Sequence, residues 1–203
     1  MKKVFLALSV ALVALVSCSK DDNSGPSVGD THEAYIDATS KTTWNYYSLE
    51  ENKLVGTGEE TDESNQAWSK RTDWDIAVCR YSIRTNSGAA TSIDAKGGVY
   101  TFGASVSFAS VTSIPEDVAF AADKAITSEG MGGTTTTVKS EATVILFKTN
   151  EDGSTIMPPV YLQAPVYLFR TADGKNYYKV QFTQYQDENS VTGHVKFNSA
   201  QIR

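Results

Sequence analysis

A run of strictly alternating apolar and polar residues lies within the segment 176–185, and it constrains the fold more than any other feature. The alternation is clearest in five successive residues: Lys179, Val180, Gln181, Phe182 and Thr183. This period of two is that of a strand with one buried face. The apolar run 166–171 precedes it, and the Asp-Gly pair between the two runs is typical of a tight turn. We therefore predict a β-hairpin over 166–185.

Short runs rich in aromatic and β-branched residues recur elsewhere in the chain. The further strands expected from them are 34–39, 44–49, 72–84, 98–103 and 191–197. Helical patterns are few. We expect one short helix over 115–124, where Pro115-Glu116-Asp117 opens the segment, and loops over 54–63 and 127–137. The predicted fold class is mostly β, an antiparallel β-sheet domain with at most one or two short helices.

The N-terminus carries the features of a bacterial lipoprotein signal peptide. Lys2 and Lys3 precede an apolar run, 4–16, which is too short for an ordinary membrane span of roughly 20 residues. The run ends in Leu15-Val16-Ser17-Cys18, the pattern of a lipobox. We predict cleavage before Cys18 and lipidation of its thiol, since two or more acyl chains anchor a protein stably. A plain secretory signal followed by a chance cysteine is the alternative.

Three parts are therefore expected: the signal peptide 1–17, a flexible acidic tether 18–33 and a β domain 34–203. The tether is polar and has little to bury. Its start, Ser19-Lys20-Asp21-Asp22, resembles the signal that follows the lipidated cysteine in Bacteroidota surface lipoproteins. This resemblance implies a protein anchored in the outer membrane at Cys18 and exposed at the cell surface, from which it could also be shed.

Charge and residue usage exclude several classes of function. The chain has 18 basic and 24 acidic residues, so its net charge is −6, and it becomes −8 once Lys2 and Lys3 are removed. Such an acidic protein is not built to bind nucleic acid. No nucleophile or acid–base set is evident, which argues against an enzyme. Cys79 is the one cysteine left after lipidation, so no internal disulfide forms, and we expect a small buried side chain there.

The methionines of the mature chain are unusual because neither lies in an apolar strand. Met131 is bracketed by glycines, and Met157 precedes Pro158-Pro159, which holds the backbone extended. Thioether sulfur is a soft, neutral ligand that suits haem iron and favours its ferrous state. A methionine is more often a gap-filler in a core, and this interpretation stays open from spacing alone.

Five blocks of sequence resemble the HmuY-like family of haem-binding lipoproteins. They are Tyr35-Ile36-Asp37-Ala38-Thr39-Ser40, Trp44-Asn45-Tyr46-Tyr47, the stretch 74–88 that starts Trp74-Asp75-Ile76-Ala77, the stretch 177–186 that starts Tyr177-Tyr178-Lys179, and Gly193-His194-Val195-Lys196-Phe197. Together they cover nearly the whole mature domain. The block that runs from Trp-Asp-Ile-Ala to Arg-Thr-Asn-x-Gly is the most specific of them.

The resemblance implies a haemophore that grips haem between two loop regions. Such a protein takes haem from host or neighbouring haemoproteins and passes it to a TonB-dependent outer-membrane receptor. The founding member uses two histidines as axial ligands, but His32 and His194 lie outside the expected loops. The resemblance therefore implies Met131 and Met157 as the axial ligands of haem iron, with the ferrous form preferred. Candidate partners for the haem propionates are Arg80, Arg84 and Lys139.

Two other functions remain open from the sequence. A surface glycan-binding lipoprotein would use exposed aromatic side chains, and Trp68, in the polar stretch 66–71, is the best candidate for one. An adhesin or assembly subunit would instead pair exposed strand edges between chains. Both alternatives predict a protein without haem.

Overall fold

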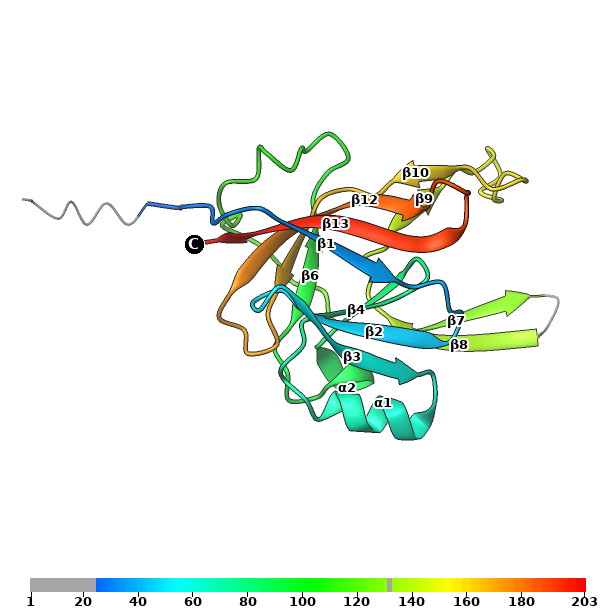
Figure 1. The fold of residues 1–203 in the computed structure, drawn as a ribbon, viewed down its shortest axis with the longest axis horizontal. Helices are drawn as coiled ribbons and strands as arrows, with labels where there is room; N and C mark the ends of the chain where they lie inside the picture. Colours follow the sequence, from blue (N-terminus) through cyan, green and yellow to red (C-terminus); the bar gives the residue numbers. More distant parts are fainter. Residues whose placement is uncertain (1–24, 131–132) are drawn as a thin grey trace, which may run out of the picture.

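The computed structural model describes residues 25–130 and 133–203, and antiparallel strands form most of it. The larger sheet has five strands in the order β1-β13-β12-β11-β6 (Figure 1). Their bounds are β1 His32–Asp37, β6 Gly98–Thr101, β11 Tyr167–Arg170, β12 Tyr177–Gln186 and β13 Thr192–Ile202. The hairpin predicted over 166–185 is confirmed as β11 and β12, which pair from Tyr167↔Val180 to Arg170↔Tyr177.

The second sheet has four antiparallel strands in the order β3-β2-β4-β5. Their bounds are β2 Thr43–Ser48, β3 Lys53–Glu59, β4 Ile76–Cys79 and β5 Ser82–Thr85. Two further pairs stand apart from the sheets: β7 Lys124–Gly130 with β8 Gly133–Lys139, and β9 Ile145–Phe147 with β10 Tyr161–Gln163. The helices are short, α1 Asp62–Ser69 and α2 Gly88–Thr91. The mostly β, antiparallel fold expected from the sequence is confirmed.

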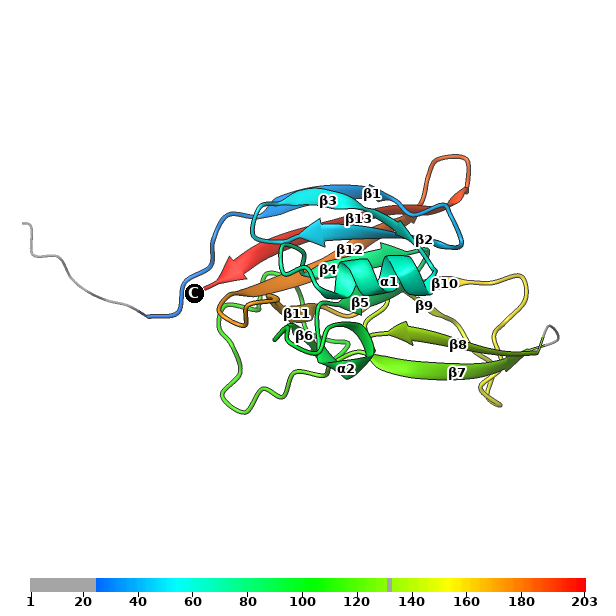
Figure 2. The same ribbon diagram turned by 90° about the horizontal axis from the view of Figure 1, so that it is seen from below.

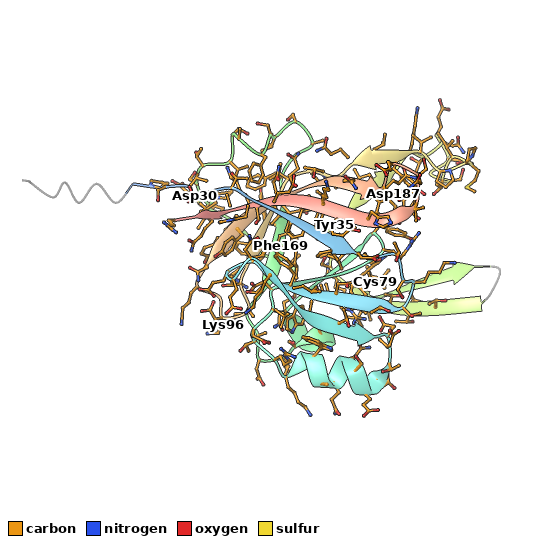
Figure 3. All side chains as sticks on the ribbon, in the orientation of Figure 1. Asp30, Tyr35, Cys79, Lys96, Phe169 and Asp187 are labelled. Atoms are coloured by element: carbon orange, nitrogen blue, oxygen red, sulfur yellow. The ribbon has the colours of Figure 1, made fainter. Side chains whose placement is uncertain are left out.

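The main core fills the space between the two sheets. Phe169 of β11 and Phe197 of β13 are fully buried in it from the larger sheet, and Ile76 of β4 from the smaller one. Figure 3 labels Phe169 in this interior. Tyr47 of β2 meets Phe197 across the interface with ring centroids 5.2 Å apart. Aromatic burial of this kind stabilises the packing of the two sheets.

Helix α1 covers the other face of the four-stranded sheet (Figure 2). Along β2, Tyr47 points to the main core while Trp44 and Tyr46 point to the helix side, as the strand period requires. The helix begins after Thr61, whose side chain accepts a hydrogen bond from the Ser64 amide. It buries Trp68, so the sheet is covered on both faces.

The segment 102–123 covers the outer face of the five-stranded sheet and contains no helix. The helix predicted over 115–124 is therefore wrong. Its apolar residues, among them Val118 and Phe120, pack instead against Leu168 and the rest of a third cluster on the sheet. Their loosely helical spacing reflects irregular packing of a loop onto strands. The loop expected over 54–63 is also wrong, because β3 runs to Glu59 and α1 begins at Asp62.

Several boundaries also differ from the prediction, and β13 extends to Ile202 instead of ending at 197. The run 72–84 contains two strands rather than one, because the chain turns at Arg80, whose φ is 54°. The tether expected over 18–33 is shorter at its end: Ser27 and Gly29 hydrogen-bond to the backbone of Arg203 and Gln201, and β1 begins at His32. Polar composition did not reveal this pairing because backbone groups make it. Among residues 25–130 and 133–203, no helix has the length and apolar character to span a bilayer.

Candidate functional site

The β7–β8 hairpin contains the first of the two expected ligand loops. Its strands pair in unbroken register from Lys124↔Lys139 to Gly130↔Gly133. A loop was predicted over 127–137, but the threonines 134–137 favour a strand, and only the connection 131–132 remains between β7 and β8. Met131 belongs to that connection and lies outside the described residues.

The connection 148–160, between β9 and β10, contains the second expected ligand. It folds back on itself: the Ile156 amide donates to the Lys148 carbonyl at 3.1 Å, and the Lys148 amide donates to the Val160 carbonyl at 2.9 Å. Met157 lies at the surface with 75% of its area exposed. A methionine this exposed is not filling a core gap, so its thioether is free to meet a ligand.

Large apolar side chains surround this connection at the surface. Leu146 and Leu162 face each other in the β9–β10 register, and each is over two-fifths exposed, as is Val160. Contiguous exposed apolar side chains commonly mark a binding surface. Exposed apolar residues therefore flank the connection that carries Met157 in the sequence.

Both segments extend from the same end of the molecule. Figure 1 and Figure 2 place the β7–β8 hairpin and the 148–160 connection at one end of the long axis, with the C-terminus and the first described residues at the other. The β7–β8 hairpin and the 148–160 connection therefore share one end of the fold.

An aromatic cluster supports the root of the β9–β10 connection. The rings of Tyr81 and Phe147 have centroids 5.0 Å apart, those of Phe147 and Tyr161 5.6 Å, and those of Tyr161 and Tyr185 5.3 Å. These edge-on contacts tie β9 and β10 to the β4–β5 turn and to β12. The root of the connection is therefore fixed while Met157 is exposed.

The positive side chains near the loops are only partly those expected. The Arg80 guanidinium donates hydrogen bonds to the carbonyls of Thr39 and Thr192, and Arg84 is buried. Neither residue is therefore suited to bind the haem propionates, as was expected of both. Lys139 lies at the root of the hairpin opposite Lys124. Lys148, which sequence reasoning missed, is exposed at the start of the connection that carries Met157. Lys148 directly follows the apolar residues 145–147, and this position could have indicated a positive charge at the start of the connection.

Neither histidine belongs to the two loops. His194 of β13 is engaged by the Tyr35 hydroxyl, with Oη and Nδ1 2.6 Å apart, and its Nε2 is 3.8 Å from the Asp187 carboxylate. His32 is in β1. Within the described part of the chain, no three histidine, cysteine, aspartate or glutamate side chains gather as a metal site.

The structure describes only one of the two cysteines for which the sequence makes a prediction. Cys18 lies outside the described residues, so its lipidation stays a prediction. Cys79 is a free, buried thiol, as expected from its strand position, and burial raises its pKa to about 11. A thiol that holds its proton this tightly is a poor nucleophile and a poor metal ligand at neutral pH.

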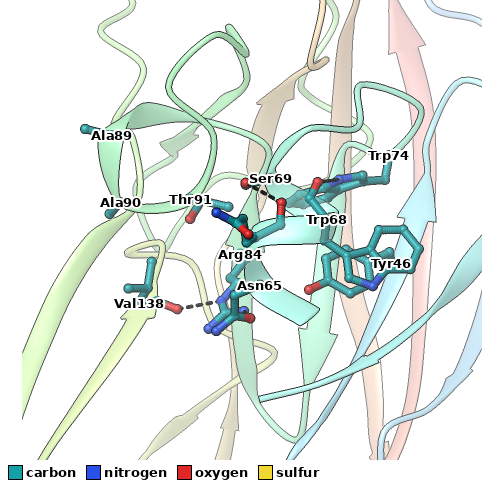
Figure 4. A pocket seen from close by; sticks show the side chains of 11 residues that line it. Tyr46, Asn65, Trp68, Ser69, Trp74, Arg84, Ala89, Ala90, Thr91 and Val138 are labelled. Atoms are coloured by element: carbon teal, nitrogen blue, oxygen red, sulfur yellow. Dashed lines mark hydrogen bonds between the residues drawn. The ribbon is translucent and has the colours of Figure 1, made fainter. Parts of the chain in front are cut away.

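A cavity of about 280 Å³ lies between α1, α2 and β8 (Figure 4). Trp68 lines it but is only 8% exposed, so the expectation of an exposed stacking platform is wrong. One face of the indole stacks on Tyr46, with centroids 3.8 Å apart, and the other lies under the Arg71 guanidinium at 4.2 Å. Neither face is open to a sugar ring.

Asp123, directly before β7, is a buried carboxylate at the root of the hairpin. It accepts hydrogen bonds from the Thr85 amide and hydroxyl and from the Thr91 hydroxyl, at 2.6 to 3.1 Å. Burial raises the pKa of Asp123 from 3.8 to about 6, and the hydrogen bonds from Thr91 and Thr85 oppose this shift. The folded protein therefore holds the Asp123 proton more tightly than the unfolded chain does.

This shift gives a testable pH dependence. Because the pKa of Asp123 is raised on folding, its contribution to stability is present below about pH 4 and is lost as the pH rises through about 6. Between pH 4 and pH 7, the unfolding free energy of wild type should fall by about 1–3 kcal/mol relative to that of Asp123→Asn, which lacks the titrating carboxyl group. Urea unfolding at both pH values checks this. Parallel pH profiles for the two proteins would contradict it.

Comparison with known proteins defines the family. The HmuY protein family matches residues 40–198, and the chain belongs to that family. No curated protein sequence matches it significantly.

Solved structures with a similar fold come from Bacteroides and Tannerella species. A candidate HmuY-like haem-binding protein from Bacteroides vulgatus is 26% identical, with a TM-score of 0.58 over 83% of this chain and 90% of the other. A candidate lipoprotein from Bacteroides fragilis is 23% identical, with a TM-score of 0.61 over 83% and 88%. The apo HmuY analogue of Tannerella forsythia is 22% identical, with a TM-score of 0.58 over 90% and 100%.

Proposed function

We propose that this protein binds haem between the β7–β8 hairpin and the 148–160 connection, with Met131 and Met157 as axial ligands of the iron. The observation that carries the proposal is that, in this HmuY family member, the β7–β8 hairpin and the 148–160 connection extend from one end of the molecule. The similar Bacteroides vulgatus structure, described as haem-binding, supports the same ligand. Haem is cargo in this proposal, and the protein performs no chemistry on it.

The residues near Met157 suit haem. A porphyrin is a flat apolar disc with two carboxylates on its edge. Leu146, Val160 and Leu162 supply exposed apolar contacts, and Lys148 supplies a positive charge on the same connection. A thioether has no proton to lose or gain, so it remains a ligand in mild acid.

Redox selectivity follows from the sulfur ligands. Methionine ligation raises the reduction potential of haem iron, so the ferrous complex should be the tighter one. We expect the protein to bind ferrous haem at least about tenfold more tightly than ferric haem, which corresponds to about 1.4 kcal/mol or more. Titration with haem, with and without dithionite and followed by the Soret band, measures both affinities. Equal or weaker binding under reduction would count against methionine ligation, and no Soret shift in either state would remove the haem-binding proposal.

We further propose that the mature protein is a surface lipoprotein anchored through Cys18, the first residue after signal peptide 1–17. The chain enters the domain at the end opposite to the two loops, which suits an anchor upstream of Gly25 and loops that face the medium. There it would take haem from host or neighbouring haemoproteins and pass it to a TonB-dependent outer-membrane receptor.

The anchor is tested by Cys18→Ser. Without the thiol no diacylglycerol can be attached, and anchoring by acyl chains is lost. We expect the variant to leave the membrane fraction, whereas wild type should remain there and be cleaved by protease added to intact cells. Cys79→Ser serves as the control, because the Cys79 thiol is buried in the domain and should not affect fractionation. A membrane-bound Cys18→Ser protein would contradict the proposal.

A further inference from the structure

The β7–β8 hairpin projects beyond the sheets, so its direction depends on how its root is held. Beyond the root, the two strands pair with each other, and an isolated two-stranded hairpin is marginally stable in water. Figure 1 and Figure 2 show the hairpin extending from the edge of the four-stranded sheet where β5 lies. Contacts from β5 and from α2 therefore set the direction of the hairpin.

Arg84 of β5 holds the β8 side of this root. Its Nε donates to the Val138 carbonyl of β8 at 2.8 Å (Figure 4). Its other nitrogens donate to Asn65 Oδ1 at 2.8 Å and to both carboxylate oxygens of Glu60 at 2.7 and 2.8 Å. The guanidinium also lies 3.9 Å from the centre of the Trp44 ring. One buried side chain thus fixes β8 to α1 and to the four-stranded sheet.

Glu60 keeps this arrangement ionised. Burial would raise the pKa of Glu60, but hydrogen bonds from Asn65, Arg84 and Trp44 outweigh burial and lower it. The Glu60 side chain is 37% exposed while that of Arg84 is 4% exposed, so water can solvate the carboxylate if the arginine is lost. A buried ion pair contributes little net stability but can enforce one geometry.

The neighbouring residue, Thr85, holds the β7 side. Its amide and its hydroxyl both donate to the carboxylate of Asp123, the residue before β7 begins, with the shortest contact 2.7 Å. Two adjacent residues of β5 therefore hold the root of the hairpin: Arg84 bonds to β8, and Thr85 bonds to Asp123 just before β7.

We infer that Arg84 and Thr85 are positioning residues for haem binding: they hold the β7–β8 hairpin at the angle at which it and the 148–160 connection grip haem together. The inference rests on the proposed function, since it names what aligns the two sides of that site. A preorganised site loses less conformational entropy on binding, and a small misplacement of one side weakens the grip. Neither residue is expected to touch haem.

The test compares Arg84→Met with Lys179→Met in the mature chain. Lys179 is a matched control: it is also buried, it donates to two backbone carbonyls, Phe108 and Val111, at 2.9 Å, and its Nζ lies 4.4 Å from an aromatic ring centre. It ties down the segment 102–123 rather than the hairpin. Both variants should lower the melting temperature, so stability alone does not separate them.

Two measurements separate positioning from structural support. The first is hydrogen exchange of the β8 amides in the haem-free protein, and the second is the rate of haem release from the ferrous complex. We expect Arg84→Met to speed both by about tenfold or more, with a loss of part of the low-spin spectrum, and Lys179→Met to change neither. Thr85→Val should act like Arg84→Met on the β7 amides. Arg84→Lys, which can reach fewer acceptors, should rescue only in part.

The outcomes distinguish this inference from the proposed function. If wild type gives no Soret shift, the haem proposal fails, and the positioning role fails with it. If wild type binds haem but Arg84→Met leaves β8 exchange unchanged, the hairpin is held by other contacts and the inference is overturned. Faster exchange with unchanged haem release would overturn it as well, because the root would then be structural without aligning the site.

Discussion

Replacement of both Met131 and Met157 by alanine is expected to abolish the low-spin ferrous haem spectrum and to weaken haem binding on the order of 100-fold or more. Loss of residues that only orient metal ligands typically costs 10–100-fold, so loss of both ligands should exceed that. Absorption spectra of reduced complexes and competition titrations measure the two effects. The single variants should each leave a five-coordinate, high-spin complex.

A matched control separates ligation from hydrophobic contact. Leu162→Ala removes an exposed apolar side chain near the connection that carries Met157 but no ligand atom. We expect it to weaken binding severalfold and to leave the spectrum low-spin. An unchanged spectrum in the double methionine variant would remove Met131 and Met157 as ligands while leaving haem binding itself intact.

Phe197→Ala is expected to destabilise the fold by about 3–5 kcal/mol. Phe197 is fully buried on β13 and packs against Phe182 of its own sheet, 5.6 Å between ring centroids, and against Tyr47 of the opposite sheet. Its removal leaves a cavity at the centre of the main core, where neither sheet can collapse easily. Denaturant unfolding of haem-free protein measures the change.

The control for Phe197 is Ile93→Ala. Ile93 is 78% exposed, so its truncation removes almost no buried area and should change stability by less than about 0.5 kcal/mol. A loss below about 1 kcal/mol for Phe197→Ala would mean that the two sheets are not held together by this core.

The hairpin strands β11 and β12 could be predicted because their signal is local, whereas β3, β7 and β8 lie largely in segments expected to be loops. Alternation in 179–183 and the Asp-Gly turn define β11 and β12 without any knowledge of the tertiary structure. Helix α1 was missed because it has one buried residue, Trp68, and therefore little apolar periodicity. Its local signal was Thr61 followed by Asp62 and Glu63, a capping residue before an acidic first turn.

The candidate site could be predicted only in part. Met131 and Met157 stand out from their neighbours, but no local pattern indicates that the β7–β8 hairpin and the 148–160 connection share one end of the fold. The grip on the hairpin root is equally non-local, since Arg84 bonds to a residue 54 positions away and Thr85 to one 38 positions away. Trp68 shows the reverse case: a polar neighbourhood suggested exposure, yet Tyr46 and Arg71 cover both of its faces.

Iron K-edge X-ray absorption of the reduced haem complex tests the central claim most directly, because sulfur and nitrogen scatterers are distinguishable around iron. The account predicts four porphyrin nitrogens and two axial sulfur atoms in wild type, and no sulfur in the variant that lacks both Met131 and Met157. Axial nitrogen or oxygen alone in the wild-type complex would contradict it.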